Sequence, residues 1–520
     1  MSWLGLSPFR STKVCVSDPK QNSAIWVKIT VVNSFMQQDT LSEALDGDLP
    51  LVFDLDGTLI KSDITFELCL LHLKAHPITG WWRLFTGFRA DKAATKALLS
   101  QEHGAELAVQ SLPFSDVLGH DRLARYSKKA LVSGSVDKVV HRVADHQGGF
   151  DHVKGSDTAR NLTGEQKAAY LKEVFPQGFD YVGDGSVDIP VWRSARKAFA
   201  YNVSDATLAR AKAQGLELDC LKTRPSEMAA LLQGMRPHQW SKNGLLLVTP
   251  LLNIGLFQPY WLTFLVFGLI ALCMVTSATY LLNDLLDIEA DRAHATKRNR
   301  PFASGELSIP TGALAIAVLG LVGLLLAFAL NIVFGAAVGV YAALSLLYSF
   351  KLKKVPVFDT FALSFLFCWR VVAGGVLLGL SNSVWFMVAI GFFFLGLALG
   401  KRVIELNRAK SRGTVVMGRG YHSEDIDVIK AAGLASSFVM VVIILIYALL
   451  EQSTVISREI SGVILAATFL IWQLRFWLLV GRDEVHDDPI VFALKDRTSL
   501  LVLLGVVLIV LYEQIIPAVI

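Results

Sequence analysis

Three aspartates at the end of an apolar segment have the residue type and spacing that metal chemistry needs. Asp284, Asp287 and Asp291 follow a charge-free run, residues 260–282, at spacings of three and four. On a helix this spacing places the three carboxylates on one face. Crowded carboxylates repel each other unless a cation lies among them, and Mg²⁺ binds carboxylate oxygens together with substrate phosphates. The segment therefore predicts a magnesium site for a phosphorylated substrate.

A basic cluster, Lys297, Arg298 and Arg300, follows the last aspartate within ten residues. Because a diphosphate group is held well where a metal ion and cationic side chains stand together, the two clusters favour a diphosphate substrate. The alternative is a solvated helix end whose acids and bases pair with each other. The preceding apolar run is about 23 residues long, enough to cross a bilayer, and this position favours the metal site.

The same segment resembles the first aspartate motif of the UbiA superfamily of intramembrane prenyltransferases, N-D-x-x-D-x-x-x-D, which begins here at Asn283. Three blocks are similar to those of decaprenyl-phosphate phosphoribosyltransferases: RPHQWSKN at 236–243, TKRNRP at 296–301 and GKRVIEL at 400–406. The resemblance spans residues 235–517. It implies an all-α polytopic membrane domain that uses Mg²⁺, phosphoribosyl pyrophosphate (PRPP) and a polyprenyl phosphate.

The resemblance also implies substrate contacts for polar residues near the ends of the apolar segments. In chain order these are Arg236, Gln239, Lys242, Asn243, Asn283, Lys297, Arg298, Arg300, Tyr348, Lys353, Asp359 and Arg370. For the first four, anchoring in lipid headgroups is the alternative. Charges inside apolar segments are costly and usually functional. We therefore expect Arg370 to face the cavity and hold a phosphate, rather than to form a buried structural pair.

The chain departs from the superfamily pattern in the loop after the apolar span near residue 392. Typical UbiA prenyltransferases carry a second aspartate motif for a second Mg²⁺, whereas this chain has Lys401, Arg402 and Glu405 in its place. Two metal ions suit the ionisation of an allylic diphosphate. One metal ion with direct cationic contacts suits PRPP, which carries a diphosphate and a 5-phosphate. Tyr421 stands at the tyrosine position of the phosphoribosyltransferase branch and is expected to close over the donor.

A second acidic pair follows a short apolar strand, residues 51–53. Asp54 and Asp56 lie two apart in DLDGTL, and Gly57 permits the sharp turn out of the strand. This motif resembles the nucleophile motif of the haloacid dehalogenase (HAD) phosphatases. Asp54 would attack phosphorus and form an aspartyl phosphate, and Asp56 would protonate the leaving alcohol and then activate water.

The other HAD motifs follow in the order of that family. The Ser133 hydroxyl would hold the transferring phosphoryl group, and Lys167 would neutralise the aspartyl phosphate; Lys154 and Lys172 are weaker candidates for this lysine. The resemblance implies Mg²⁺ bound by the motif carboxylates, Asp54, Asp56, Asp184 and Asp188. The alternative is a HAD fold that has lost activity and serves as a scaffold.

The elements that must position these residues form two parts. The chain has 520 residues, of which 53 % are hydrophobic, and a mean hydropathy of +0.47. Strands and helices alternate in residues 48–225, which predicts an α/β HAD domain with a Rossmann-like, doubly wound parallel sheet. Residues 60–125 are expected to form its helical cap. Residues 1–47 are expected to be poorly ordered, with Met36 as an alternative start.

Three aromatic residues in the predicted cap, Trp81, Trp82 and Phe85, are expected to pack in the core of the cap. The alternative is that they contact lipid, which would matter if the substrate is a polyprenyl lipid.

The second part, residues 235–520, is expected to contain nine apolar spans, centred near 250, 271, 320, 341, 368, 392, 441, 470 and 507. Lysine and arginine gather in alternate loops, so the positive-inside rule predicts a multi-pass inner-membrane protein with both sites on the cytoplasmic side. No block of like charge indicates a nucleic-acid partner. The five scattered cysteines predict neither a disulfide framework nor a zinc site.

These observations predict a bifunctional membrane enzyme. The membrane part would transfer 5-phosphoribose from PRPP to a polyprenyl phosphate, and the HAD part would remove the 5-phosphate to give polyprenyl-phosphoryl ribose. One alternative is a UbiA-type prenyltransferase acting on an aromatic or other acceptor. The other is a HAD part that is regulatory or acts separately. An oligomer is compatible with the sequence.

Overall fold

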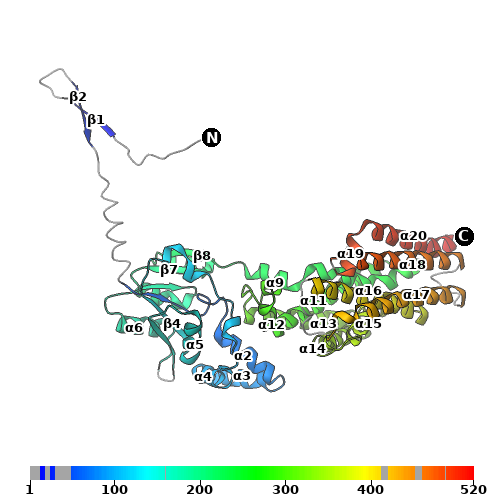
Figure 1. The fold of residues 1–520 in the computed structure, drawn as a ribbon, viewed down its shortest axis with the longest axis horizontal. Coiled ribbons are helices and arrows are strands. Elements are labelled where there is room, and N and C mark those ends of the chain that lie inside the picture. Colours follow the sequence, from blue (N-terminus) through cyan, green and yellow to red (C-terminus); the bar gives the residue numbers. More distant parts are fainter. Residues whose placement is uncertain are drawn as a thin grey trace. The chain divides into compact units, whose positions relative to one another are not determined.

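The computed structural model describes residues 12–17, 24–29, 49–157, 160–411, 420–450, 459–486 and 488–519. The chain forms two compact units, Met1–Arg224 and Pro225–Ile520, and each has its own core (Figure 1).

The first unit is built on a six-stranded parallel sheet in the order β5-β4-β3-β6-β7-β8. This confirms the predicted doubly wound topology, in which the chain moves outward from a central strand in both directions. Ligands of such sheets bind beyond the carboxyl ends of the strands where the order reverses, here between β3 and β6. The strands are β3 (Leu51–Phe53), β4 (Lys129–Val136), β5 (His152–Ser156), β6 (Asp180–Gly183), β7 (Ala198–Val203) and β8 (Asp219–Thr223).

Alternate residues of β3 pack against opposite layers of helices. Leu51 and Phe53 share a core with α5 (Asp137–Gln147), whereas Val52 shares one with α6 (Gly164–Val174) and α7 (Ile189–Ser194). All three side chains are fully buried, as expected for a central strand covered on both faces. Each such burial stabilises the fold by about 1.5–3 kcal/mol. β3 is therefore a rigid base for the residues that follow it. The last helix of this unit is α8 (Asp205–Ala213), and the second unit begins with α9 (Glu227–Met235).

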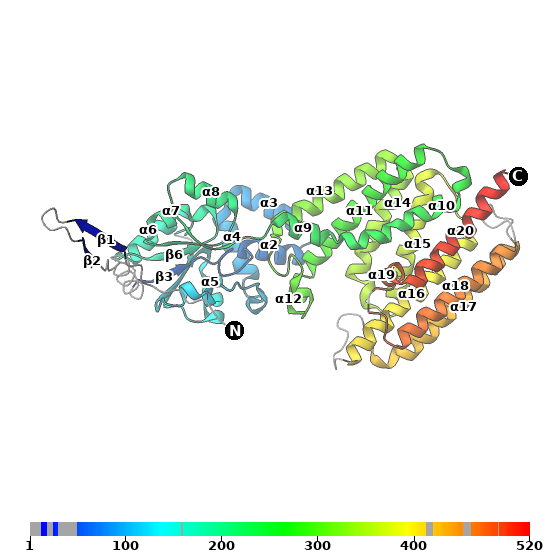
Figure 2. The same cartoon turned by 90° about the horizontal axis from the view of Figure 1, so that it is seen from above.

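Helices between β3 and β4 form the predicted insertion (Figure 2). They are α2 (Ile64–Ala75), α3 (Gly80–Ala90) and α4 (Lys92–His103), followed by the short turns η1 (Val109–Ser111), η2 (Val117–Gly119) and η3 (Asp121–Leu123). The side chains of Asp63 and Asp91 accept hydrogen bonds from the first backbone amides of α2 and α4. These caps explain where both helices begin.

The aromatic residues of α3 are not in the core of this insertion. Trp81, Trp82 and Phe85 are 62 %, 70 % and 59 % exposed, so the expectation of a core position is wrong. The reason lies in the helical period: Leu84 and Phe88, four residues apart, take the inward face and pack against the core. The three exposed rings lie on the rest of the helix surface.

Two strands lie within residues 1–47, for which the sequence predicts no order. β1 (Thr12–Ser17) pairs antiparallel with β2 (Ala24–Ile29). The rest of that segment, Met36 included, lies outside the described residues.

The second unit is helical, and seven of its described helices are long and apolar enough to cross a membrane. These are α11 (Tyr260–Leu286), α13 (Ile309–Leu330), α14 (Ile332–Phe350), α15 (Phe358–Leu378), α16 (Val384–Ser411), α17 (Ile426–Leu450) and α18 (Glu459–Gly481). The shorter elements are η5 (Pro237–Leu247), α10 (Val248–Leu252), η6 (Ile254–Leu256), α12 (Ile288–Ala293), η7 (Lys297–Asn299), η8 (Leu352–Lys354), η9 (Ser423–Asp425) and α19 (Pro489–Lys495).

The nine predicted spans are thus not confirmed within the described part of the chain. The span expected near residue 250 is divided between η5 and α10, because Pro250 lacks the amide hydrogen that a continuous helix would donate to the carbonyl of Leu246. α20 (Arg497–Val519) covers the span expected near residue 507 and is not one of the seven.

Close backbone contact fixes η5 against α15. A side chain at Gly374 would place its Cβ 1.9 Å from the carbonyl oxygen of Leu246, so only glycine permits this approach. Leu246 is itself fully buried with residues of α11, α14 and α15. The approach brings the polar residues of η5 beside the middle of α15.

Candidate active sites

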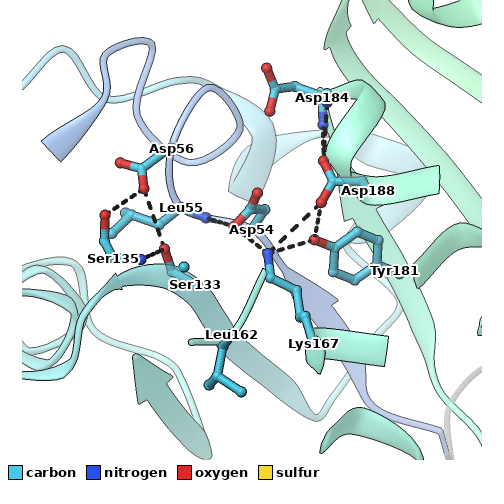
Figure 3. Close-up of polar contacts among 12 residues, drawn as sticks. Asp54, Leu55, Asp56, Ser133, Ser135, Leu162, Lys167, Tyr181, Asp184 and Asp188 are labelled. Atoms are coloured by element: carbon cyan, nitrogen blue, oxygen red, sulfur yellow. Dashed lines mark hydrogen bonds and ion pairs between the residues drawn. The ribbon is translucent and has the colours of Figure 1, made fainter. Parts of the chain in front are cut away.

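The first candidate site lies at the carboxyl end of β3 (Figure 3). The Oδ1 atom of Asp54 accepts hydrogen bonds from the Leu55 amide and from Lys167 Nζ, both at 2.8 Å. Lys167 extends from α6 and also donates to Tyr181 Oη at 3.0 Å. Its Nζ lies 3.8 Å from Asp188 Oδ1. The structure therefore brings together residues that span 134 positions of the sequence, from Asp54 to Asp188.

Three carboxylates of this site fit a metal ion. Asp54, Asp184 and Asp188 each offer an oxygen, and these oxygens lie within 4.8 Å of one another. The backbone amides of Asp184 and Gly185 donate to Asp188 Oδ2 at 3.2 and 3.0 Å and so fix its orientation. Gly57, with φ of +80°, leaves room where a Cβ would lie 2.2 Å from Asp184 Oδ2. Hard oxygen ligands of this kind suit Mg²⁺.

Asp56 lies outside this group of three and faces the end of β4. Its Oδ2 accepts a hydrogen bond from Ser135 Oγ at 2.6 Å and lies 3.4 Å from Ser133 Oγ, and its Oδ1 accepts from the Ile64 amide at 2.8 Å. A carboxyl group beside the metal group but not in it is placed for proton transfer rather than for metal binding. The metal role predicted for Asp56 therefore has no support from this geometry.

Burial shifts the acidity of these groups. It raises the pKa of Asp54 to about 6 and that of Asp56 to about 7, and it raises the pKa of Asp184 as well. Burial acts to lower the pKa of Lys167, but the charges of Asp54 and Asp188 outweigh it and raise this pKa. Crowded carboxylates that resist ionisation are stabilised as anions by a bound cation.

We expect Mg²⁺ to bind this site more tightly as pH rises from about 5 to about 8. A carboxyl with a raised pKa keeps its proton until the pH passes that value, and only the ionised form of Asp54 or Asp184 can bind the ion. Isothermal titration calorimetry of the full-length protein in detergent measures this. Asp184→Asn should remove the pH-dependent component, and Asp116→Asn, an exposed carboxylate with a pKa lowered to about 2, should retain it. Affinity that does not change with pH would contradict the assignment.

The second candidate site lies where α11 ends. Asp284 Oδ1 accepts hydrogen bonds from Arg236 Nη2 at 2.5 Å and from Arg300 Nη1 at 3.0 Å. The same Arg300 nitrogen donates to Asp291 Oδ2 at 2.7 Å. Asp284 and Asp291 are 3 % and 2 % exposed. A single cationic nitrogen therefore lies between two buried carboxylates, which is a position that also fits a metal ion.

The third aspartate of the motif is separate from this pair. α11 ends at Leu286, and Asp287 leaves helical geometry before α12 begins at Ile288. Asp287 consequently turns toward Lys353 Nζ, 2.8 Å away. The structure thus connects two of the three predicted carboxylates, Asp284 and Asp291, through Arg300, and pairs Asp287 with Lys353 instead. Mg²⁺ commonly uses one or two carboxylates with substrate phosphates, so Asp284 and Asp291 remain a suitable pair.

A cationic cluster lies between η5, α15 and α16. Lys242 Nζ and Lys401 Nζ share one carboxylate, that of Asp488, at 3.0 and 2.8 Å. Lys242 also lies over the ring of Phe367, 5.9 Å from its centroid, and the guanidinium of Arg370 lies 5.4 Å from the same centroid. Two lysines thus share one acidic side chain, and Arg370 lies beside the same phenylalanine ring as Lys242.

Arg370 is the most buried of these cations, at 4 % exposed. Its Nε donates to Asn243 Oδ1 at 3.1 Å, its Nη1 donates to the Leu366 carbonyl, and its Nη2 donates to Tyr341 Oη. Among the described residues these partners are all uncharged. An arginine buried without an anion carries a desolvation cost of several kcal/mol, which a phosphate would offset.

Arg402 and its neighbours form a structural ion pair instead. Arg402 Nε lies 2.6 Å from Asp359 Oδ2, and Tyr421 Oη donates to Asp359 Oδ1 at 2.6 Å. Arg402 and Asp359 are 1 % and 0 % exposed, and Arg402 also contacts Glu405 and, at 3.4 Å, Tyr348 Oη. The substrate contacts predicted for these residues have no support from this geometry.

The remaining predicted contacts vary in exposure. Gln239 and Asn283 are half-buried, and Lys297 and Arg298 are exposed on η7. Four polar residues of the two sites were missed by the sequence analysis: Ser135, Tyr181, Tyr341 and Asp488. Ser135 had a signal, since it lies two residues after Ser133 and shares its face of the strand. Asp488 precedes Pro489 and would be predicted only as a helix cap, because its lysine partners are distant in sequence.

Replacing Arg402 should destabilise the protein, because Arg402→Ala leaves Asp359 buried without its cation. Removal of one partner of a buried ion pair costs about 3–5 kcal/mol. Lys401→Ala is the matched control, since the side chain of Lys401 is 32 % exposed. Thermal unfolding in detergent should show a clear loss for Arg402→Ala and a small one for Lys401→Ala. Equal stability of the two variants would contradict the structural role.

Comparison with known proteins finds a family match within the helical unit. Residues 251–492 match the UbiA prenyltransferase family. The uncharacterized protein y4nM of Sinorhizobium fredii is 38 % identical over 464 residues, which cover 88 % of this chain and 89 % of that protein. The decaprenyl-phosphate phosphoribosyltransferase of Corynebacterium glutamicum is 37 % identical over 194 residues, and the chain spans 58 % of that enzyme.

A solved structure of a UbiA homolog from Archaeoglobus fulgidus, bound to GPP and Mg²⁺, is 16 % identical with a TM-score of 0.42. It covers 55 % of this chain and 98 % of its own. The family match includes the aspartates of the second site, and the helical unit carries seven apolar helices within its described residues. The chain therefore carries a UbiA prenyltransferase family domain at residues 251–492, in a unit whose described part has seven helices long and apolar enough to cross a membrane.

Proposed function

We propose that the helical unit transfers 5-phosphoribose from PRPP to a polyprenyl phosphate, and that the first unit, a HAD-type phosphatase, then removes the 5-phosphate. Partial similarity to a decaprenyl-phosphate phosphoribosyltransferase supports the substrate pair. The replacement of a second acidic motif by Lys401, Arg402 and Glu405 supports a donor other than an allylic diphosphate.

The observation that carries this proposal is the buried guanidinium of Arg370 among uncharged partners. Lys242 and Lys401 lie nearby and share the carboxylate of Asp488, so, among the residues that the structure describes, this part of the unit favours an additional anion. PRPP and a polyprenyl phosphate together bring three separate phosphate-containing groups. The acceptor phosphate or the 5-phosphate of the donor would lie here.

The donor diphosphate would lie at the end of α11. Arg236, Arg300 and Lys353 each pair with an aspartate and would exchange it for phosphate oxygens. Mg²⁺ held by Asp284 and Asp291 would neutralise charge on the leaving group. The acceptor phosphate oxygen attacks the anomeric carbon as the bond from that carbon to pyrophosphate breaks. Because the acceptor is already an anion, no strong base is needed.

The isoprenoid chain would lie in an apolar cavity of about 740 Å³ bordered by α14, α15 and α16. Its lining includes Phe361, Phe365 and Trp369 from α15, the helix that also carries Arg370. This arrangement supports a lipid whose phosphate meets the buried cations and whose tail meets apolar rings.

In the first unit, the Asp54 carboxylate would attack the 5-phosphate, and Asp56 would protonate the departing ribose oxygen. Lys167 holds Asp54 oriented, and Ser133 and Ser135 orient Asp56. Water activated by Asp56 would then hydrolyse the aspartyl phosphate. The loop charges favour an inner-membrane location with both sites on the cytoplasmic side.

The test is mass spectrometry of products formed by purified full-length protein with Mg²⁺ and polyprenyl phosphate. With PRPP, we expect polyprenyl-phosphoryl ribose and pyrophosphate. A parallel reaction supplies geranylgeranyl diphosphate and 4-hydroxybenzoate in place of PRPP. Prenylation in that reaction, without any ribosylated lipid in the first, would overturn the proposal in favour of an aromatic prenyltransferase.

The exposed rings of α3 should help the first unit act on a lipid at the membrane surface. Trp81, Trp82 and Phe85 lie beside Arg83 and Arg89, a combination suited to an interface with anionic headgroups. A Trp81→Ala/Trp82→Ala variant should dephosphorylate a lipid-linked 5-phosphoribose about 10-fold more slowly, with little change for a soluble phosphate ester. Equal losses with both substrates would contradict the lipid role.

A further inference from the structure

A group of histidines and glutamates joins two helices of the insertion in the first unit. His72 lies on α2, and Glu102 and His103 lie at the end of α4. His72 and His103 are 3 % and 6 % exposed, whereas the Glu102 side chain is 39 % exposed. These residues are separate from the carboxylates beside β3 and have no part in the proposed reactions.

The three potential ligand atoms have the separations of a tetrahedral metal site. His72 Nδ1 lies 3.1 Å from His103 Nε2 and 3.3 Å from Glu102 Oε2, and the last two atoms are 3.7 Å apart. Zinc binds such nitrogen and oxygen ligands at about 2.0–2.2 Å, and the edges of a tetrahedron of that size are about 3.3–3.6 Å. The observed separations scatter around that length.

A further glutamate fixes the ring of His103 for this role. His103 Nδ1 lies 3.0 Å from Glu106 Oε2. A carboxylate at this position holds the proton on Nδ1, so the lone pair of Nε2 points toward His72 and Glu102. Metal-bound histidines almost always donate their second N–H to a carboxylate, carbonyl or water in this way.

We propose that His72, Glu102 and His103 bind one divalent transition-metal ion of the zinc class, with Glu106 as the partner that orients His103. Three protein ligands leave a fourth position for water. The ion would link the end of α4 to α2 and so hold these two helices of the insertion together. No sequence pattern indicates this site, because its ligands are not cysteines and come from two helices 30 residues apart (72 to 102).

The test uses Co²⁺ as a spectroscopic probe for the ion in tag-free, full-length protein in detergent, with Mg²⁺ in excess to fill the carboxylate sites. We expect one equivalent of Co²⁺ to give intense visible absorption typical of tetrahedral geometry, without a thiolate charge-transfer band. His103→Gln should abolish the absorption. Glu106→Gln, which keeps the three ligands, should weaken binding about 10–100-fold. Zn²⁺ should displace the Co²⁺.

His141→Gln is the matched control, because His141 is exposed on α5 and also lies near a carboxylate, Asp137. It should bind Co²⁺ as the wild type does. The competing interpretation is a chain of hydrogen bonds from Glu106 through His103 to His72, with no metal. Absence of tetrahedral absorption in the wild type, or binding that survives both His103→Gln and Glu106→Gln unchanged, would overturn the proposal.

Discussion

Asp54→Asn should make the protein accumulate the 5-phosphorylated lipid and none of the dephosphorylated product. Under the proposed function Asp54 is the nucleophile, and an amide cannot attack phosphorus at a useful rate. Loss of a nucleophile typically costs at least about 1,000-fold in turnover. Thin-layer or mass-spectrometric separation of the two lipids, which differ by one phosphate, measures the ratio directly.

The structure indicates that this variant retains its fold. The backbone amide of Asp54 donates to the Val182 carbonyl at 3.0 Å, and that bond does not involve the side chain. The amide oxygen of asparagine can still accept hydrogen bonds from Leu55 and Lys167. Asp54→Asn also removes a negative charge from a crowded group whose members have raised pKa values, so stability should not fall.

Asp116→Asn serves as the matched control, since that carboxylate pairs with Lys222 away from the site and carries no proposed role. It should give wild-type products. If the wild type itself yields only the phosphorylated lipid, the first unit acts on another substrate. The transferase proposal would then stand alone, and the two-step proposal would be wrong.

The first site was predictable from sequence because its residues follow strands of one parallel sheet. Asp54 follows β3, and Asp184 follows β6, its neighbour in the sheet. Parallel neighbours end at the same edge, so motifs at strand ends must meet there. Lys167 was predictable as a motif residue, although its bond to Tyr181 was not. In the sequence, Tyr181 is one residue of a largely apolar strand. Only the fold brings its hydroxyl group to Lys167 and Asp188.

The second site was less predictable because it depends on breaks in helices and on distant pairs. Nothing in NDLLDIEAD shows that α11 ends at Leu286, yet that end separates Asp287 from Asp284. Arg402 has the residue type of a phosphate ligand, but Asp359, 43 positions earlier, takes its charge. Residue type indicates that a cation needs an anion; only the fold determines whether the protein or a substrate provides it.

Asp284→Asn should lower ribosylation of the lipid at least about 100-fold, the usual cost of losing one charged group that acts on a developing negative charge. Asp284 is the residue on which Arg236 and Arg300 converge, and it forms with Asp291 the pair that fits Mg²⁺. Substitution removes the anionic ligand and the charge that pairs with both arginines. The rate of pyrophosphate release with saturating PRPP and polyprenyl phosphate measures the effect.

Asp287→Asn tests whether the structure or the sequence motif better describes the roles of the three aspartates. The motif alone treats the three aspartates alike, whereas the structure pairs Asp284 with Asp291 and directs Asp287 to Lys353. We therefore expect Asp291→Asn to resemble Asp284→Asn, and Asp287→Asn to raise the KM for PRPP with a smaller loss of kcat. Hydrolysis of a supplied 5-phosphoribosyl lipid should be unchanged in all three, because the two sites lie in different units.

Near-normal ribosylation by Asp284→Asn would exclude the pair from the mechanism. A larger loss in Asp287→Asn than in Asp291→Asn would instead mean that the metal site forms from Asp284 and Asp287 only when substrate displaces Lys353.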